Sequence, residues 1–213
     1  MTVRRQLTGE DEARAYAEAW GEPEAVAKLH QYTELLLAEN KHQNLISKPS
    51  EVHLWERHIA DSAQLLEHVP RETYRTGSPG PWLDLGTGPG LPGIVIAVLC
   101  PQIEVVLVES RARRVDFLQR CVSELSLKNC TVIGERLERV TPFKCWVISA
   151  RAFAPLEKLM VLSAPFSTKS TRFLLPKGRS AAHELAKAKP SIRRMFHVKH
   201  SLTDGEAGII VSK

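Results

Sequence analysis

Residues 81–93 read PWLDLGTGPGLPG, and the apolar run IVIAVL follows directly at residues 94–99. A short apolar stretch with one carboxylate therefore breaks into four glycines within eight residues before a second apolar stretch begins. This pattern predicts a strand, a tight loop and a helix. Loops of this kind bind nucleotides, because glycines let the chain turn sharply off the strand end and let a ligand approach the backbone. A glycine-rich turn without a ligand is the structural alternative.

The loop at 88–93 formally matches the G-x-G-x-x-G fingerprint of dinucleotide sites, and Glu109 follows 21 residues after its first glycine. A pyrophosphate needs free N–H groups at the helix N-terminus, but Pro89 and Pro92 remove two donors from this loop. The loop therefore favours a ligand without phosphates. S-adenosylmethionine fits, because Glu109, at the end of the strand predicted at 103–108, can accept hydrogen bonds from both ribose hydroxyls.

Short motifs recur beyond this loop. Together they read NLxS at 44–47, RHIxDS at 57–62, LDLGTGPGLPG at 83–93, RRVxFL at 113–118, ISxRAF at 148–153 and LxKG at 175–178. In this combination the chain closely resembles the bacterial small-subunit ribosomal RNA guanine-N7 methyltransferases, long called glucose-inhibited division protein B, over about residues 25–210. The resemblance implies a Rossmann-like class I methyltransferase fold and S-adenosylmethionine as the cofactor. It also implies methylation of guanine N7 in 16S ribosomal RNA, at guanine 527 of the 530 loop, in the small ribosomal subunit or an assembly intermediate.

The predicted cofactor site combines the glycine loop with the ends of the following strands. Leu137 can pack on the adenine ring, and Glu138 or the adjacent backbone can accept a hydrogen bond from the exocyclic amine, as the matching pair does in the family. By resemblance, Arg151 is the catalytic residue and acts by positioning: its planar guanidinium holds the cofactor's carboxylate or the target guanine. The residues expected to bind the cofactor are Asp84, Gly86, Gly88, Gly90, Leu91, Glu109, Leu137, Glu138 and Arg151.

Positive charge gathers towards the C-terminus. Lysines and arginines minus aspartates and glutamates give −5 for residues 1–70, +3 for residues 71–168 and +7 for residues 169–213, which sum to the net charge of +5. This distribution is compatible with a nucleic-acid partner, although solvated basic faces are also common.

Several basic residues are candidates for contact with RNA. Arg111, Arg113 and Arg114 begin a predicted helix, where the macrodipole disfavours cations, so either an RNA phosphate or solvent is expected to face them. Arg57, His58 and Asp61 are placed towards the substrate cleft by the resemblance alone. The residues expected to contact RNA are Arg57, His58, Arg111, Arg114, Phe153, Lys177 and Arg179, with the Arg193-Arg194 pair completing a basic rim.

The chain divides into a helical N-terminal cap, residues 1–70, and a methyltransferase domain, residues 71–213. The boundary falls at residues 70–81, which contain three prolines and two glycines. Helices are predicted at 10–20 and 23–39, and a third is predicted to begin with Ser50 as its N-cap. The apolar face of this third helix would carry Val52, Trp55, Ile59 and Leu66. On the same helix, a solvated Arg57–Asp61 pair at i, i+4 is the structural alternative to an RNA contact.

Beyond the loop, strands are predicted at 103–109, 130–133, 146–149 and 171–175, with a helix at 111–126 and a short helix after 179. Alternating strands and helices predict an α/β fold with a mostly parallel, doubly wound sheet and the ligand at the carboxyl ends of the strands. Residues 195–200 and 208–211 are predicted to close the sheet as an antiparallel pair.

The sequence lacks the motifs of two other classes of methyltransferase. The segment after the fourth strand reads Ser-Ala-Arg-Ala-Phe, without the Asn/Asp-Pro-Pro-aromatic loop used on exocyclic amines or a cysteine nucleophile. Guanine N7 carries no proton, so in-line attack on the methyl group needs no general base. Three alternatives stay open: methylation of another RNA, an NAD(P)-dependent oxidoreductase that uses Glu109 on the ribose, and a non-enzymatic RNA-binding factor. The oxidoreductase would need a catalytic tyrosine, and no tyrosine follows Tyr74.

Composition sets the outer bounds. A chain of 213 residues with 43% hydrophobic and 25% charged residues is typical of one globular domain with an elaborated terminus. No apolar run reaches the length of a membrane span, and residues 1–7 lack an apolar signal core, so a cytoplasmic location is expected. The four cysteines form no CxxC pair. We expect reduced thiols in the core and no metal site.

Overall fold

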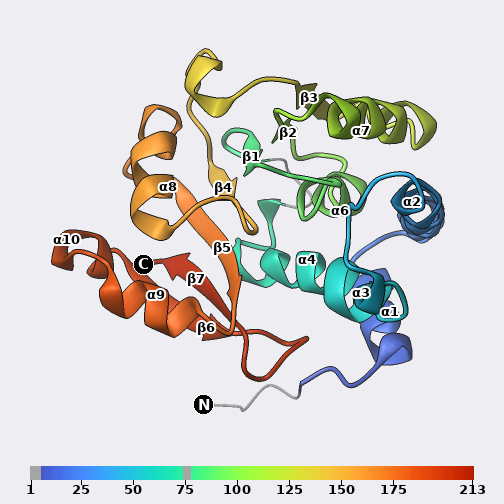
Figure 1. Ribbon diagram of the computed structural model, residues 1–213, viewed down its shortest axis with the longest axis horizontal. Coiled ribbons are helices and arrows are strands. Elements are labelled where there is room, and N and C mark those ends of the chain that lie inside the picture. Colours follow the sequence, from blue (N-terminus) through green and yellow to red (C-terminus); the bar gives the residue numbers. More distant parts are fainter. Residues whose placement is uncertain (1–5, 74–77) are drawn as a thin grey trace.

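The computed structural model describes residues 6–73 and 78–213. Residues 1–5 of the N-terminal stretch and residues 74–77 of the predicted boundary at 70–81 lie outside the described residues. The described chain forms a seven-stranded sheet in the order β3-β2-β1-β4-β5-β7-β6 (Figure 1). Its strands are β1 Trp82–Leu85, β2 Val105–Val108, β3 Cys130–Ile133, β4 Val147–Ser149, β5 Arg172–Gly178, β6 Phe196–His200 and β7 Gly208–Ser212.

The first five strands are parallel, whereas β7 pairs antiparallel with both β5 and β6. The predicted mostly parallel sheet with an antiparallel last strand is confirmed. Every residue of β1 and β2 is buried, because helices cover both faces of the sheet. Alternate residues enter different cores: Val105 and Leu107 pack on one face, and Val106 and Val108 pack on the other.

Each face of the sheet has its own helical layer (Figure 1). The first core contains residues of α2, α6 and α7, and the second contains residues of α8 and α9. The helices of the two layers are α6 Gly93–Leu99, α7 Ala112–Glu124, α8 Leu156–Ser163, α9 Ala181–Lys187 and α10 Pro190–Arg193, and the short 3-10 turns are η3 Leu137–Arg139 and η4 Ala164–Phe166. The sequence pattern had not indicated α8 or α10.

The N-terminal segment is helical, as predicted, and it packs on the α6 side of the sheet. Its elements are α1 Glu10–Glu18, α2 Pro23–Asn40, α3 Lys48–Glu51, η1 Trp55–Ala60, α4 Asp61–Ala63 and η2 Gln64–His68. Residues of this segment share one hydrophobic core with α6 and α7. Among the described residues the cap therefore has no separate core. The division of the chain near residue 70 remains a prediction.

The third helix differs from its prediction. Ser50 is not an N-cap: it lies inside α3, where its hydroxyl donates to the carbonyl of Ser47 at 2.7 Å. The helix starts earlier because Pro49 is well suited to a first helical turn. Val52 is 72% exposed, although Trp55, Ile59 and Leu66 are buried as predicted. The chain continues as the π-helix η1, the short α-helix α4 and the 3-10 helix η2. A single helical periodicity therefore does not describe this segment.

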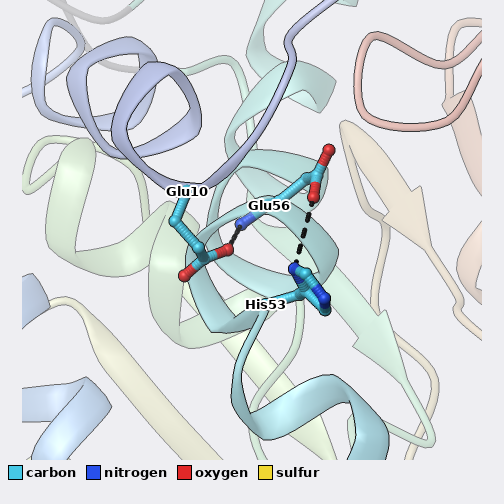
Figure 2. A group of neighbouring side chains, drawn as sticks. All are labelled: Glu10, His53 and Glu56. Carbon is cyan, nitrogen blue, oxygen red and sulfur yellow. Dashed lines mark hydrogen bonds and ion pairs between the residues drawn. The ribbon is translucent and has the colours of Figure 1, made fainter.

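A carboxylate fastens α1 to this irregular segment. The two carboxylate oxygens of Glu10 accept the N–H groups of Trp55 and Glu56 at 3.0 and 2.8 Å, and Figure 2 shows the side chain reaching the backbone of Glu56. The first N–H groups of a helical segment have no partner within it. Glu10 therefore stabilises the start of η1 from another helix. The neighbouring His53 lies 3.8 Å from the Glu56 carboxylate.

All four cysteines are buried and free, as predicted. Burial raises the pKa of each thiol to about 12, so the thiols are protonated and inert at neutral pH. Among the described residues, we find no helix that is both long enough and apolar enough to span a membrane.

Replacing Glu10 by alanine tests how much its two hydrogen bonds to η1 stabilise the fold. Glu10→Ala leaves two N–H groups of η1 without their acceptor, and the free energy of unfolding should fall by about 1 to 3 kcal/mol. Asp11→Ala, which removes an exposed carboxylate from the same helical turn, is the matched control and should change stability by less than about 0.5 kcal/mol. Urea denaturation followed by circular dichroism measures both, and equal stabilities would contradict the assignment.

Candidate functional site

Two neighbouring cavities at the carboxyl ends of the parallel strands share part of their lining. The smaller has a volume of about 380 Å³ and is lined by the ends of β1 and β2 and by residues 135–138. The larger has a volume of about 840 Å³ and lies between the N-terminal segment, β5, β7 and the loop after β4. Residues 152–154 line both cavities. Two bound molecules would therefore meet at this loop.

Glu109 is the fixed acceptor of the smaller cavity. One carboxylate oxygen accepts the N–H groups of Ser110 and Arg111 at 2.7 and 2.9 Å, and the other accepts the N–H of Gly88 at 3.1 Å. Arg114 lies 3.7 Å from the second oxygen. The residue is 5% exposed and still lines the cavity. Because these donors hold it on both oxygens, the carboxylate has a set orientation beside the N-terminus of α7, where a negative charge is favoured.

The glycine loop is supported from below by Asp84. This fully buried carboxylate accepts hydrogen bonds from the Thr87 hydroxyl at 2.5 Å, the Gly93 N–H at 3.0 Å and the Ser149 hydroxyl at 2.7 Å. Burial raises the pKa of Asp84 to about 6, although these hydrogen bonds oppose the shift. A Cβ on Gly93 would lie 2.2 Å from the Leu107 side chain, so helix α6 packs against the sheet only with glycine at this position.

The loop has few free donors for a phosphate. The N–H of Thr87 bonds to Val108, those of Gly90 and Leu91 bond to the Thr87 carbonyl, and those of Gly88 and Gly93 bond to carboxylates. Pro89 and Pro92 carry no N–H. From residue 87 to residue 93, every backbone donor is therefore engaged. This arrangement does not fit the pyrophosphate of a dinucleotide, which argues against the oxidoreductase alternative.

The structure separates the residues predicted to bind the cofactor. Gly86, Glu109, Leu137 and Glu138 line the smaller cavity. Other members of the predicted set lie beneath the loop or beyond the cavity lining: Asp84, Gly88, Gly90 and Leu91 shape the loop, and Arg151 lines the larger cavity. The sequence pattern located the loop but could not show which of its residues face the cavity.

The residues predicted to contact RNA are also divided between the two cavities. Arg57, His58, Phe153 and Lys177 line the larger cavity. Phe153 also lines the smaller cavity, together with Arg111 and Arg114. Arg179 is 72% exposed and pairs with Asp204 and Glu206.

The predicted continuous basic rim is not what the structure shows. Arg193 and Arg194 donate to carbonyls of α9 and α10 and line neither cavity. The reason is that Arg193 and Arg194 precede β6, which begins at the same end of the sheet as β5, whereas the other predicted rim residues lie at the carboxyl ends of β2 and β5. Linear charge counts do not show this.

Arg151 projects from the loop after β4 towards the N-terminal segment. Its Nη1 lies 3.1 Å from Nδ1 of His58, 3.7 Å from the Asp61 carboxylate and 3.5 Å from the Arg57 carbonyl. The expected Arg57–Asp61 pair is replaced by this arrangement, because Arg57 lies 3.9 Å from Asp204 instead. Arg151 therefore joins the cap to the sheet across the larger cavity.

Sequence reasoning missed the residues that complete the larger cavity. Asp61 accepts hydrogen bonds from Gln64 at 2.8 Å and Thr203 at 3.0 Å, and Ser201 bonds to Gln64. These partners are separated from Asp61 by up to 142 positions, so no local motif indicated them. Asp61 itself stands in the RHIxDS motif, which was the available signal. The further lining residues that had not been predicted are Ser47, Ser50, Glu184, Ser201, Thr203 and Asp204.

Lys177 holds the loop that both cavities share. Its side chain is 7% exposed, and Nζ donates to the carbonyl of Ala154 at 2.7 Å and to Glu184 at 3.1 Å. In the same loop Ala152 has φ of +51°, a left-handed conformation that costs energy for a residue with a Cβ. Because most of its side chain is buried, Lys177 supports the loop in this structure.

The residues of the smaller cavity fit S-adenosylmethionine, the cofactor implied by the resemblance. Glu109 offers a fixed acceptor for ribose hydroxyls, and Leu137, which is 4% exposed, offers an apolar surface for the adenine. At Gly86, with φ of +61°, a Cβ would lie 2.4 Å from the Phe153 ring. Glycine at this position therefore lets the Phe153 ring pack directly on the loop backbone.

Comparison with known proteins identifies relatives along nearly the whole chain. A family profile described as rRNA small subunit methyltransferase G (GidB) matches residues 25–207. A relative named ribosomal RNA small subunit methyltransferase G from Erythrobacter litoralis is 49% identical over 207 residues, which is 97% of each chain. The protein of the same name from Novosphingobium aromaticivorans is 52% identical and covers 89% of this chain and 80% of its own length.

Solved structures with a similar fold are distant in sequence. A ribosomal protein methylase from Lactobacillus delbrueckii subsp. bulgaricus has a TM-score of 0.54 and 13% identity, over 74% of this chain and 78% of that chain. A mutant of MtNAS in complex with S-adenosylmethionine has a TM-score of 0.53 and 16% identity, over 95% of this chain and 88% of that chain. These likenesses confirm the predicted class I methyltransferase fold.

The pKa of Asp84 predicts a pH dependence of stability. Because the pKa rises from its ordinary value of 3.8 to about 6 in the fold, the native state binds a proton more tightly than the unfolded state between these values. Stability should therefore fall by up to about 3 kcal/mol as pH rises through this window. Asp84→Asn should remove that fall, whereas the exposed control Asp116→Asn should keep it. Urea denaturation at a series of pH values tests this, and identical profiles would contradict it.

Proposed function

Since this chain belongs to the rRNA small subunit methyltransferase G family, we propose that it transfers a methyl group from S-adenosylmethionine to N7 of a guanine in 16S ribosomal RNA. The proposed target is guanine 527 of the 530 loop, presented by the small ribosomal subunit or an assembly intermediate. One observation carries the assignment of roles to the two cavities: they are adjacent, and both open onto residues 152–154.

The smaller cavity is proposed to hold the cofactor. Bound S-adenosylmethionine supplies an electrophilic methyl group on a sulfonium ion. Glu109 would accept hydrogen bonds from the ribose, Leu137 would pack on the adenine, and Glu138 or its neighbouring backbone would accept from the exocyclic amine. The engaged N–H groups of the glycine loop favour this ligand over one with a pyrophosphate there.

The larger cavity is proposed to hold the target nucleotide. Its volume of about 840 Å³ is in the range of small-molecule sites, and Arg57, Arg151 and Lys177 lie along its wall. Guanine offers O6 and N7 as acceptors, and arginine is the side chain best shaped to hold such a pair. An RNA phosphate can also be met at the mouth of the cavity by Arg179, which is largely exposed.

The residues around the cavities are suited to orientation rather than proton transfer. N7 has an in-plane lone pair and no proton to lose, so the reaction needs no base. Burial and the charges of Arg151 and Arg57 lower the pKa of His58 to about 3, which makes it a poor proton carrier at neutral pH. Holding two reactants in near-attack geometry can contribute about 7 to 11 kcal/mol. Catalysis here is therefore proposed to come from position.

The cofactor assignment is tested at Glu109. Glu109→Gln keeps the size of the side chain but removes its charge, so the proposed ribose contacts weaken and the dissociation constant for S-adenosylmethionine should rise about 10- to 100-fold. Glu104→Gln changes an exposed carboxylate just before β2 and should bind as the wild type does. Isothermal titration calorimetry measures both, and unchanged affinity in Glu109→Gln would remove Glu109 from the site.

The role of Arg151 is tested by methyl transfer. Arg151→Lys keeps the charge but loses the planar fork, so the single-turnover rate on small subunits that lack the modification should drop about tenfold, or roughly 1.4 kcal/mol. The product is identified by mapping 7-methylguanosine in the 16S RNA. Arg193→Lys, on an arginine that lines neither cavity, is the matched control. If Arg151→Lys reacts as fast as the wild type, Arg151 does not position either reactant.

A further inference from the structure

Both ring nitrogens of His58 are already engaged within the protein. Nδ1 lies 3.1 Å from Nη1 of Arg151, and Nε2 lies 2.9 Å from the Ser50 hydroxyl. The residue is 9% exposed, although it lies at the wall of the larger cavity. A side chain that touches RNA through a ring nitrogen would first have to give up one of these partners. The RNA contact expected from the resemblance is therefore difficult to reconcile with this geometry.

The chemistry of the partners sets the direction of each hydrogen bond. Arginine has donors only, so Nδ1 of His58 must accept and the ring proton must be on Nε2. The Nε2–H then donates to Ser50, whose own hydroxyl proton is directed to the Ser47 carbonyl at 2.7 Å. The chain of donors runs from Arg151 through His58 and Ser50 to a backbone acceptor, and every member is satisfied.

We propose that His58 is a positioning residue that fixes the guanidinium of Arg151 at the wall of the larger cavity. This inference rests on the proposed function only for its consequence in catalysis. The hydrogen bonds themselves are features of the fold.

Arg151 requires such a partner because little else directs it. It comes from the loop after β4. Its Nη1 reaches the Arg57 carbonyl only at 3.5 Å, and the Asp61 carboxylate, 3.7 Å away, attracts it at a distance longer than a hydrogen bond. His58 adds the short contact that selects one orientation. Asp61 and His58 both belong to the N-terminal segment, so the cap orients an arginine of the sheet.

The backbone around His58 is arranged for this contact. His58 lies in the π-helical segment η1. π-helical turns are rare in proteins, and those that occur are often found at functional sites. Glu10 holds the first N–H groups of η1 from α1 (Figure 2). The segment therefore keeps its unusual winding, and with it the direction of His58, through contacts with a residue that does not line the larger cavity.

The charge state of His58 agrees with an acceptor role. The charged groups nearest to it are Arg57 on its own element, Arg151 from the loop after β4 and Asp61 on α4. The two arginines and burial lower its pKa to about 3. The imidazole is therefore neutral across the physiological range, and the contact with Arg151 does not switch with pH.

The tautomer can be observed directly in the full-length protein. Nitrogen NMR of the histidine side chains should show His58 as the neutral Nε2–H form with no titration between about pH 5 and 8. Arg151→Lys should shift its Nδ1 resonance. A proton on Nδ1, or titration of His58 within this range, would overturn the proposal.

Kinetics separate positioning from RNA contact. His58→Leu removes the acceptor, so kcat at saturating cofactor and subunit should fall at least about tenfold, with the KM for subunits changed less than about threefold. His58→Asn offers a carboxamide oxygen in place of Nδ1 and should recover activity to within about threefold of the wild type. His53→Leu, on the same segment and outside both cavity linings, is the control.

Two further measurements test whether His58 positions Arg151. Affinity for S-adenosylmethionine should be unchanged in His58→Leu, which also shows that the variant is folded. In an Arg151→Lys background, His58→Leu should add little, because the two residues act as one unit. A rise in KM alone, or full additivity with Arg151→Lys, would overturn positioning. If the wild type transfers no methyl group to subunits, the proposed function fails, but the NMR result still decides whether His58 holds Arg151.

Discussion

The buried carboxylate of Asp84 is the constraint on which the site depends. An ionised carboxylate without water is costly unless donors surround it, and here the donors come from the glycine loop, the start of α6 and the end of β4. Trp82 extends the network, because its indole N–H donates to the Ser149 hydroxyl at 2.8 Å. One side chain therefore sets the position of the loop over the first strand relative to the end of the fourth. The loop after β4 lines both cavities, and the end of β1 lines the smaller one.

Satisfying the loop internally also restricts its ligand. A loop whose N–H groups pointed outward would attract phosphate. The N–H groups of this loop donate instead to Glu109, Asp84 and backbone carbonyl groups. Beside the smaller cavity lie instead the Gly86 backbone, against which the Phe153 ring packs, and a fixed carboxylate at Glu109. The cofactor preference follows from where the donors are directed more than from the number of glycines.

Sequence reasoning succeeded where structure is local. The strand–loop–helix around residues 81–99, the five parallel strands and the antiparallel closure follow from periodicity and turn residues, which act over a few positions. It failed where contacts are long-range. The π-helix at 55–60 depends on a carboxylate 45 positions away, and the partners of Arg151 lie 90 or more positions before it. No spacing rule connects such residues, and the resemblance that suggested His58 as an RNA contact gave no indication of its partners Arg151 and Ser50.

The larger cavity has a physical consequence for the N-terminal cap. Its wall is formed partly by the cap and partly by the sheet, and Arg151 reaches between them to His58 and Asp61. The cap also shares its core with α6, the helix that follows the glycine loop and whose first N–H, that of Gly93, donates to Asp84. Displacing the cap would therefore open the cavity and release Arg151 at the same time. Packing of the apolar core and orientation of Arg151 therefore both depend, in this fold, on how the cap is seated on the sheet.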